Sequence, residues 1–169
     1  MAKPRKETAR RRKAARRETA LTDARVLVAE ARFYEDLADM LLKGATRVLE
    51  DAGVAYDRVS VPGALEIPCA IVIALEAADD AGRPYDGVVA LGCVIRGETS
   101  HYDIVAGESA RALVDIALAR GLPIGNGVLT VDTEAQAEAR ARPDKWNKGG
   151  GAAEAALALI RLKRSFRVR

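Results

Sequence analysis

The chain has 169 residues, of which 49% are hydrophobic and 30% charged, and these values are in the range of a single globular domain with a buried core. Aromatic residues make up only 4%, so the apolar content is mostly aliphatic, which favours helices packed on a buried sheet over a β-sandwich. No apolar run approaches the roughly 20 residues of a membrane span, and no apolar stretch follows the N-terminal charges as it would in a secretory signal. We therefore expect a cytoplasmic protein that does not enter a membrane.

Positive charge is concentrated at the N-terminus. Residues 1–20 contain nine basic and two acidic side chains, a net charge of +7, whereas the other residues contain 18 basic and 22 acidic side chains, a net charge of −4. A segment so charged and so poor in apolar residues cannot bury enough surface to offset the entropy of ordering. The sequence therefore predicts a basic, disordered arm at 1–22 and a folded domain at 23–169.

From Ala24 onward, short β-branched runs alternate with longer helical stretches, and Gly53 is expected to end the first helix. The run 87–95 (GVVALGCVI) is nearly all apolar, as expected for a central strand covered on both faces. Short connections between alternating strands and helices imply a parallel sheet with right-handed crossovers and helices on both faces. In chain order, the predicted elements are strand 25–31, helix 36–52, strand 56–61, helix 65–78, strand 87–95, helix 101–120, strand 124–131 and two C-terminal helices separated around 143–151.

The last helix carries an apolar stripe at steps of three or four residues. This stripe is typical of a face that packs on the protein's own sheet, and we favour that interpretation over a face kept for a partner. Its members are Ala152, Ala155, Leu159, Leu162 and Phe166.

The two cysteines, Cys69 and Cys93, each lie within an apolar run. Their spacing matches neither a metal site nor a disulfide framework. We expect two buried, reduced thiols and no bound metal.

In an open parallel sheet, ligands bind beyond the carboxyl ends of the strands. After strand 87–95, Gly97 would allow a tight turn, and Thr99 and Ser100 offer hydroxyls and amides at the opening of a helix, an arrangement that can hold an anion. Ser100 with Asp103 also resembles a helix-capping arrangement, which accounts for these two residues as well as a ligand site does.

His101 is the only histidine of the chain. An imidazole exchanges its proton near neutral pH, so His101 is either a proton-transfer residue or an exposed residue without a chemical role. Glu66 follows a turn, where a carboxylate either stabilises the start of the next helix or contacts a hydroxylated ligand. Phe33 follows the first strand, where core packing is the usual role but stacking on a planar ring is the alternative.

Arg140 lies on a predicted helix, and Lys148 opens the glycine-rich segment 148–151. A glycine-rich loop that enters a helix can hold phosphate, although this one lacks the strand and the Ser/Thr pattern of a P-loop. An arginine can instead bind phosphate through two parallel hydrogen bonds.

Four segments together resemble a known family. They are ARF after the first strand, VPGALEIP after the second, GCVIRGETSHYD after the third and NKGGGAAEA at the last helix. In this order and spacing they resemble the lumazine synthase family over about residues 24–166. The resemblance implies a flavodoxin-like fold, a three-layer α/β/α sandwich with a four-stranded parallel sheet.

The resemblance also implies a reaction of riboflavin biosynthesis. In this reaction, 5-amino-6-(D-ribitylamino)uracil and 3,4-dihydroxy-2-butanone 4-phosphate condense to 6,7-dimethyl-8-ribityllumazine. An amine of the uracil forms an imine with the ketone, phosphate is eliminated, and the ring closes with loss of water. The reaction implies neither a metal nor a redox cofactor.

At matching positions, His101 resembles the proton-transfer residue of the family and Arg140 its phosphate-binding arginine. Lys148 resembles a lysine that approaches the heterocycle from a neighbouring subunit. The other matching positions imply contacts with substrate: Phe33 stacked on the pyrimidine, Ala64, Leu65 and Glu66 along the ribityl chain, Val94 and Ile95 around the pyrimidine, and Gly97, Glu98 and Thr99 around the phosphate.

Family sites lie between adjacent subunits of a homopentamer, so Asn126, Arg140 and Lys148 would come from one chain and the other residues from its neighbour. The resemblance leaves open whether pentamers stay free or assemble into a 60-subunit shell. Two positions depart from the family pattern. Asn126 stands where many members have an aromatic, which removes a stacking partner worth about 1 kcal/mol, and Leu65 replaces another frequent aromatic.

Two alternatives stand beside this interpretation. The first is a weakly active isoenzyme that mainly binds lumazine or flavin, but the presence of His101, Arg140 and Lys148 together favours catalysis. The second is nucleic-acid binding through the basic arm, which would be nonspecific and salt-dependent. The arm has no aromatic residues to stack on bases, so we do not expect this as the main function. A flavodoxin or response regulator would need a phosphate loop or an acidic cluster after strand 25–31, and neither is present.

Overall fold

The computed structural model describes residues 21–167; residues 1–20, which hold most of the predicted basic arm, and residues 168–169 lie outside the described residues. Four parallel strands form one sheet in the order β2-β1-β3-β4. The strands are β1 (Arg25–Ala31), β2 (Ala55–Val61), β3 (Gly87–Ile95) and β4 (Ile124–Val131). The helices are α2 (Glu35–Asp51), α3 (Ile67–Asp80), α4 (His101–Arg120), α5 (Glu134–Ala141) and α6 (Lys148–Arg167), with a short 3-10 helix, η1 (Ala64–Glu66).

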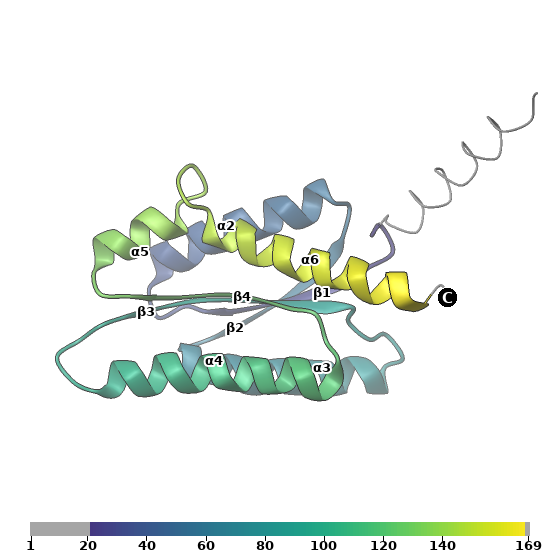
Figure 1. Ribbon diagram of the computed structural model, residues 1–169, viewed down its shortest axis with the longest axis horizontal. Coiled ribbons are helices and arrows are strands. Elements are labelled where there is room, and N and C mark those ends of the chain that lie inside the picture. The colour runs from purple at the N-terminus through teal and green to yellow at the C-terminus, as the bar shows by residue number, and fades with distance from the viewer. Residues whose placement is uncertain (1–20, 168–169) are drawn as a thin grey trace, which may run out of the picture.

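Helices cover the sheet on both faces, with α2, α5 and α6 on one side and α3 and α4 on the other (Figure 1). The predicted α/β/α sandwich with a four-stranded parallel sheet is confirmed. The strand β3 lies between β1 and β4 and is buried along most of its length, as its continuous apolar run predicts. Gly53 adopts a φ of 66° just after α2, a left-handed conformation that suits glycine at a helix end.

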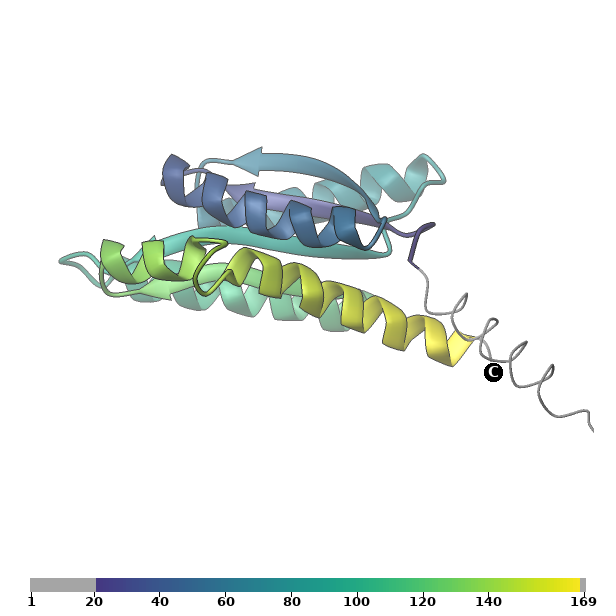
Figure 2. The ribbon, with the colours of Figure 1, turned by 90° about the horizontal axis from the view of Figure 1, so that it is seen from above.

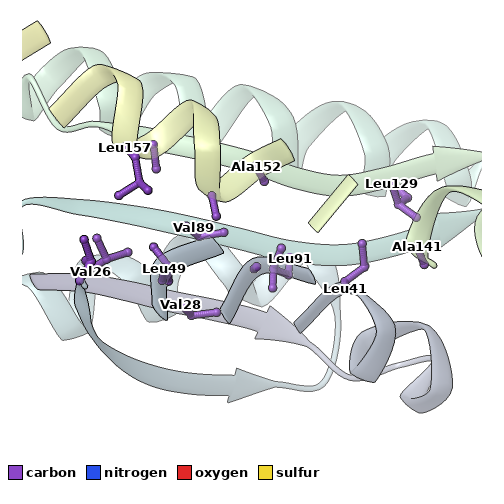
Figure 3. Close-up of a cluster of buried hydrophobic side chains, with 14 of the residues drawn as sticks. Val26, Val28, Leu41, Leu49, Val89, Leu91, Leu129, Ala141, Ala152 and Leu157 are labelled. Carbon is purple, nitrogen blue, oxygen red and sulfur yellow. The ribbon is translucent and has the colours of Figure 1, made fainter. Parts of the chain in front are cut away.

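The alternation of side chains along β1 builds two cores. Val26 and Val28 point to the α2 and α6 side, where they meet Leu41, Leu49 and other buried residues (Figure 3). Leu27 and its neighbours of the same parity point to the α3 and α4 side. Each large apolar side chain that is fully buried stabilises the fold by about 1.5 to 3 kcal/mol, so the two clusters hold the helices on the sheet.

The first turn of α6 packs directly on α2, and the two helices lie side by side (Figure 2). A Cβ on Gly149 would collide with the carbonyl oxygen of Leu41 on α2, so this contact requires glycine. The prediction of a glycine-rich loop at this point is wrong, because Lys148 and the three glycines after it form the first turn of α6. Glycine serves close helix packing here.

Two other predicted boundaries differ from the structure. The helix expected at 65–78 is the short η1 followed by α3, which continues to Asp80 and has Pro68 in its first turn, where the missing N–H of proline costs little. The connection between α5 and α6 spans only 142–147.

The predicted core stripe of α6 is wrong. Leu159 is 42% exposed, Leu162 is 53% exposed and Phe166 is 67% exposed. Ala152 alone of the stripe is buried, and the face that meets the sheet consists of Ala152, Ala153, Ala156, Leu157 and Ile160. The helix has two apolar faces, and spacing alone cannot tell which of them meets the sheet.

A buried carboxylate ties β1 to the edge strand β2. Glu30 is fully buried, and its Oε1 accepts hydrogen bonds from Ser60 Oγ at 2.8 Å and from Arg58 Nε at 2.6 Å. Arg32 bridges Glu30, at 3.3 Å, and Asp39 on α2, at 2.7 Å. The network therefore fixes the end of β1, immediately before the segment that carries Phe33.

No helix within residues 21–167 combines the length and the apolar content that crossing a membrane requires.

Candidate functional site

A cavity of about 420 Å³ opens at the carboxyl ends of β1 and β3. The segment after β1, the turn and η1 after β2, the end of β3 and the first turn of α4 form its walls. This is the edge at which an open parallel sheet binds ligands.

The cavity gathers most of the residues to which the sequence analysis gives a role. Those on its wall are Phe33, Ala64, Leu65, Glu66, Val94, Ile95, Gly97, Thr99 and His101. Four others do not line it: Glu98, in the same segment as Gly97, and Asn126, Arg140 and Lys148, which lie elsewhere on this chain.

Phe33 is 72% exposed and lies at the mouth of the cavity. Its ring meets Tyr34 edge to face, with centroids 4.9 Å apart. The expectation of core packing for Phe33 is wrong, because the chain turns outward after β1 and leaves this ring in solvent. An exposed ring at this place is free to stack on a flat ligand.

The segment 96–100 differs from its expected geometry. Gly97 does not adopt a left-handed φ, and a Cβ on it would meet nothing within 4 Å, so the turn itself does not require glycine. Ser100 occupies the N-cap position of α4 without a capping hydrogen bond from its side chain. The predicted Ser100–Asp103 cap is therefore wrong; instead, the His101 amide donates to Thr99 Oγ1 at 3.4 Å.

His101 is the first residue of α4, and its side chain is exposed on the cavity wall. Tyr102 follows it on the wall, and the Arg96 guanidinium lies 4.1 Å from the centroid of the Tyr102 ring. Arg96 NH1 also lies 3.5 Å from Asp103 Oδ1. Arg96 therefore contacts the first turn of α4 at the two residues that follow His101.

Glu66 lies at the end of η1, in the N-cap position of α3, but its side chain makes no capping hydrogen bond there. A Cβ on Gly63 would lie only 2.9 Å from Glu66 Oε2. The glycine thus leaves room for the carboxylate, which remains free to meet a ligand in the cavity.

The two cysteines differ in their surroundings. Cys69 is exposed, which contradicts the expectation of a buried thiol, because it lies in the first turn of α3 on the side that faces away from the sheet. Cys93 is partly buried at the cavity wall, and burial raises the pKa of its thiol to about 12. Cys93 is therefore a neutral group at physiological pH and contributes apolar surface to the wall.

The other predicted site residues lie away from the cavity, and two of them, Arg140 and Lys148, form a second group on the same chain. Arg140 lies on α5 and Lys148 at the start of α6, and both contact the Trp146 ring: the guanidinium carbon lies 4.4 Å and the ammonium nitrogen 5.8 Å from its centroid. Asn126 is exposed on β4, and its Oδ1 accepts a hydrogen bond of 2.9 Å from the Val128 amide. One chain therefore carries two separate groups of candidate residues.

Several residues of the site carry no role in the sequence analysis. Tyr102 and Cys93 are next to assigned residues in the cavity wall, and Trp146 lies between the two cations of the second group. In the sequence, these residues lie next to the motifs at the strand ends. That position alone does not show which of them face the ligand. The unassigned residues of the cavity wall are Tyr34, Pro62, Gly63, Cys93, Tyr102 and Val105.

Within the described part of the chain, no three His, Cys, Asp or Glu side chains gather as a metal site. The fold is that of a flavodoxin-like α/β protein, with a cavity at the carboxyl edge of its sheet. The chain belongs to the 6,7-dimethyl-8-ribityllumazine synthase family, whose model matches residues 23–164.

Individual relatives agree with this assignment. A 6,7-dimethyl-8-ribityllumazine synthase of Azorhizobium caulinodans is 66% identical over 144 residues, which is 85% of this chain and 89% of the relative. The synthase of Nitrobacter winogradskyi is 60% identical over 147 residues, which is 87% of this chain and 90% of the relative. A protein of Rhodopseudomonas palustris named 6,7-dimethyl-8-ribityllumazine synthase 1 is 57% identical, with 87% and 90% coverage.

Proposed function

We propose that this protein is a transferase of riboflavin biosynthesis that condenses 5-amino-6-(D-ribitylamino)uracil with 3,4-dihydroxy-2-butanone 4-phosphate to 6,7-dimethyl-8-ribityllumazine. The observation that carries the proposal is a cavity at the carboxyl edge of the sheet whose wall brings together an aromatic ring, a carboxylate and the only histidine of the chain. The family and the relatives point to the same activity.

Each proposed role follows from where a side chain lies. The exposed Phe33 ring stacks on the flat pyrimidine, and Glu66 accepts hydrogen bonds from ribityl hydroxyls. Imine formation, loss of phosphate and ring closure each move a proton, and His101 exchanges protons at the cavity wall. Gly97 and Thr99, beside the start of α4, offer amides and a hydroxyl to the phosphate.

Three of the remaining contacts with substrate, those of Asn126, Arg140 and Lys148, come from a second subunit. Arg140 and Lys148 lie outside the cavity of their own chain, and a neighbour that presents them to the cavity supplies the positive charge that the departing phosphate requires. Val94 and Ile95 complete the pyrimidine pocket, Ala64 and Leu65 contact the ribityl chain, and Glu98 contributes its backbone amide. Asn126 of the neighbour approaches the heterocycle as a polar side chain.

A homopentamer suits this division. Head-to-tail contacts around a closed ring use every interface and complete a site at each one. Both helical layers expose apolar residues: Leu159, Leu162 and Phe166 on α6, and Ile73 and Leu118 on α3 and α4. The stripe on α6 is thus available to a second copy of the chain.

The experiment that tests the activity mixes the purified protein with both substrates and follows lumazine absorbance. Turnover that depends on both substrates supports the proposal. Tight lumazine binding without turnover would favour the weakly active alternative.

Analytical ultracentrifugation of the same sample tests the oligomeric state. Five copies of the 18.1 kDa chain give a particle of about 90 kDa in a closed pentamer, far from the mass of a 60-subunit shell.

We also propose that residues 23–169 form the catalytic domain and that 1–22 form a separate arm. The match to the family begins at residue 23, which supports this division. A cytoplasmic location belongs to the same proposal and rests on two free thiols. Deletion of residues 1–20 should leave turnover and the mass of the ring unchanged. Dissociation into monomers would show that the arm is needed to hold the subunits together.

A further inference from the structure

Trp146 is the only tryptophan of the chain, and it lies in the connection between α5 and α6 with 59% of its surface exposed. A side chain of this size normally contributes to a core, yet Trp146 belongs to neither core cluster of the described residues. Its ring instead contacts two cations, Arg140 and Lys148. The ring therefore serves a charged surface and not the core.

Neither cation has an acidic partner within residues 21–167. Arg140 NH1 donates to the Gln136 carbonyl at 3.1 Å, which holds one terminal nitrogen of the guanidinium and leaves its other two nitrogens without a hydrogen bond to residues 21–167. The nearby carboxylates of Glu138 and Asp144 both bind Arg142. Two positive charges therefore meet at one aromatic ring, and no carboxylate of residues 21–167 is paired with either of them.

The backbone beside Trp146 is held in an unusual conformation. Asn147 has a φ of 46° and is the one non-glycine residue with a positive φ between residues 21 and 167. Its Oδ1 accepts a hydrogen bond of 3.2 Å from the Gly150 amide and so caps α6. A Cβ on Gly44 of α2 would collide with that oxygen. This left-handed turn lies between Trp146 and Lys148 and packs against α2. The packing fixes the position of the Trp146 ring relative to the Lys148 ammonium group.

We propose that Trp146 is a positioning residue whose ring holds the Arg140 guanidinium and the Lys148 ammonium together as one binding site for the phosphate group of the butanone substrate. The inference rests on the proposed function, because it concerns the substrate of that reaction. Long cationic side chains lose rotamer freedom when they bind an anion, and a ring that already contacts both removes part of this loss before binding. In this proposal the ring does not touch the reacting atoms. It therefore increases the affinity for phosphate and leaves the rate of the chemical step unchanged.

The kinetic test replaces Trp146 by leucine and by phenylalanine. Loss of the two ring contacts in Trp146→Leu should raise the KM for the butanone phosphate about three- to tenfold, with kcat and the KM for the pyrimidine within about twofold of the parent. Trp146→Phe keeps an aromatic face and should restore most of the affinity. Lys145→Ala is the matched control, because Lys145 is an exposed cation of the same connection, whereas the cations over the ring are Arg140 and Lys148.

A purely structural role for Trp146 predicts another pattern: both KM values and the melting temperature would change together, and that result would overturn the proposal. An equal KM for the butanone phosphate in Trp146→Leu and the parent would overturn it as well.

Calorimetric titration with inorganic phosphate separates this inference from the proposed function. The parent and Trp146→Phe should bind phosphate several-fold more tightly than Trp146→Leu, whether or not the protein turns over the two substrates. Absence of turnover in the parent would contradict the proposed function alone. Equal phosphate affinity in all three proteins would contradict the positioning role alone.

Discussion

Arg96, the first residue after β3, donates a hydrogen bond of 2.9 Å from its Nε to Oδ1 of Asp132, the first residue after β4. The same guanidinium covers the Tyr102 ring in the first turn of α4. The hydrogen bond to Asp132 raises the pKa of Arg96 above its already high usual value, so the charge persists at every working pH. Two adjacent strand ends and the turn that presents His101 are thus joined through one side chain.

We predict that Arg96→Ala lowers kcat about tenfold, because the turn that carries His101 loses its anchor and a small misplacement of a proton-transfer group is costly. The control is Arg111→Ala, which removes an exposed arginine of α4, the helix that begins at His101. Arg111 also binds two carboxylates, Glu108 and Asp115, but does not line the cavity. Steady-state kinetics of both variants would measure the difference. Equal kcat values in the two variants would show that Arg96 does not position the site.

Replacement of His101 should separate chemistry from assembly. His101→Ala is expected to slow turnover by about 10- to 10⁴-fold, the range that general acid–base groups contribute. The side chain is exposed on this chain, so the mass of the assembly measured by light scattering should not change. Turnover at the parent rate would remove His101 from the mechanism.

Two glycines of the same helical turn offer a matched pair for stability. Gly149→Ala places a methyl group against the Leu41 carbonyl and should reduce the free energy of unfolding by about 1 to 3 kcal/mol. Gly151→Ala has nothing within 4 Å of the new methyl group and should increase it by about 0.5 to 1 kcal/mol, since alanine favours the helix. Urea denaturation at a fixed protomer concentration checks both. Equal effects of the two substitutions would contradict the close contact between α6 and α2.

The thiol of Cys93 should react slowly and in a pH-dependent way. Because burial raises its pKa to about 12, only about one Cys93 in ten thousand is a thiolate at about pH 8. The thiolate is the reactive form, so labelling by iodoacetamide should accelerate about tenfold for each pH unit up to about pH 10. Mass spectrometry can follow Cys93 with the exposed Cys69 as the internal reference. Equal labelling of the two thiols at about pH 8 would contradict the burial of Cys93.

Strand positions could be predicted well from the sequence, because a strand covered on both faces needs an uninterrupted apolar run. The run 87–95 has this property, and β3 has the same bounds. Helix α4 also has its predicted bounds, since Gly121 adopts a left-handed φ of 54° immediately after it. The edge of the sheet at which the cavity lies follows from the parallel order of the strands and not from any single side chain.

The parts that sequence reasoning missed depend on neighbours distant in the chain. The role of Gly149 requires knowing that Leu41 lies beside it, and the exposure of Leu159 requires knowing which of two apolar faces of α6 meets the sheet. The function of Trp146 is likewise invisible in spacing, because its contact with Arg140 depends on the left-handed turn at Asn147. Local patterns show which residues are unusual, whereas tertiary packing decides what they touch.

The separation of His101 from Arg140 on one chain has a genetic consequence. In the proposed ring, each subunit gives His101 to one site and Arg140 to the next, so a His101→Ala subunit inactivates one junction and leaves the other intact. Two alleles that are defective alone should therefore complement each other: equal random mixing of His101→Ala and Arg140→Ala subunits restores an intact pair at about a quarter of the junctions. Co-expression of the two alleles should raise turnover well above that of either variant, and a mixture as inactive as its parents would mean that both residues serve the same subunit's site.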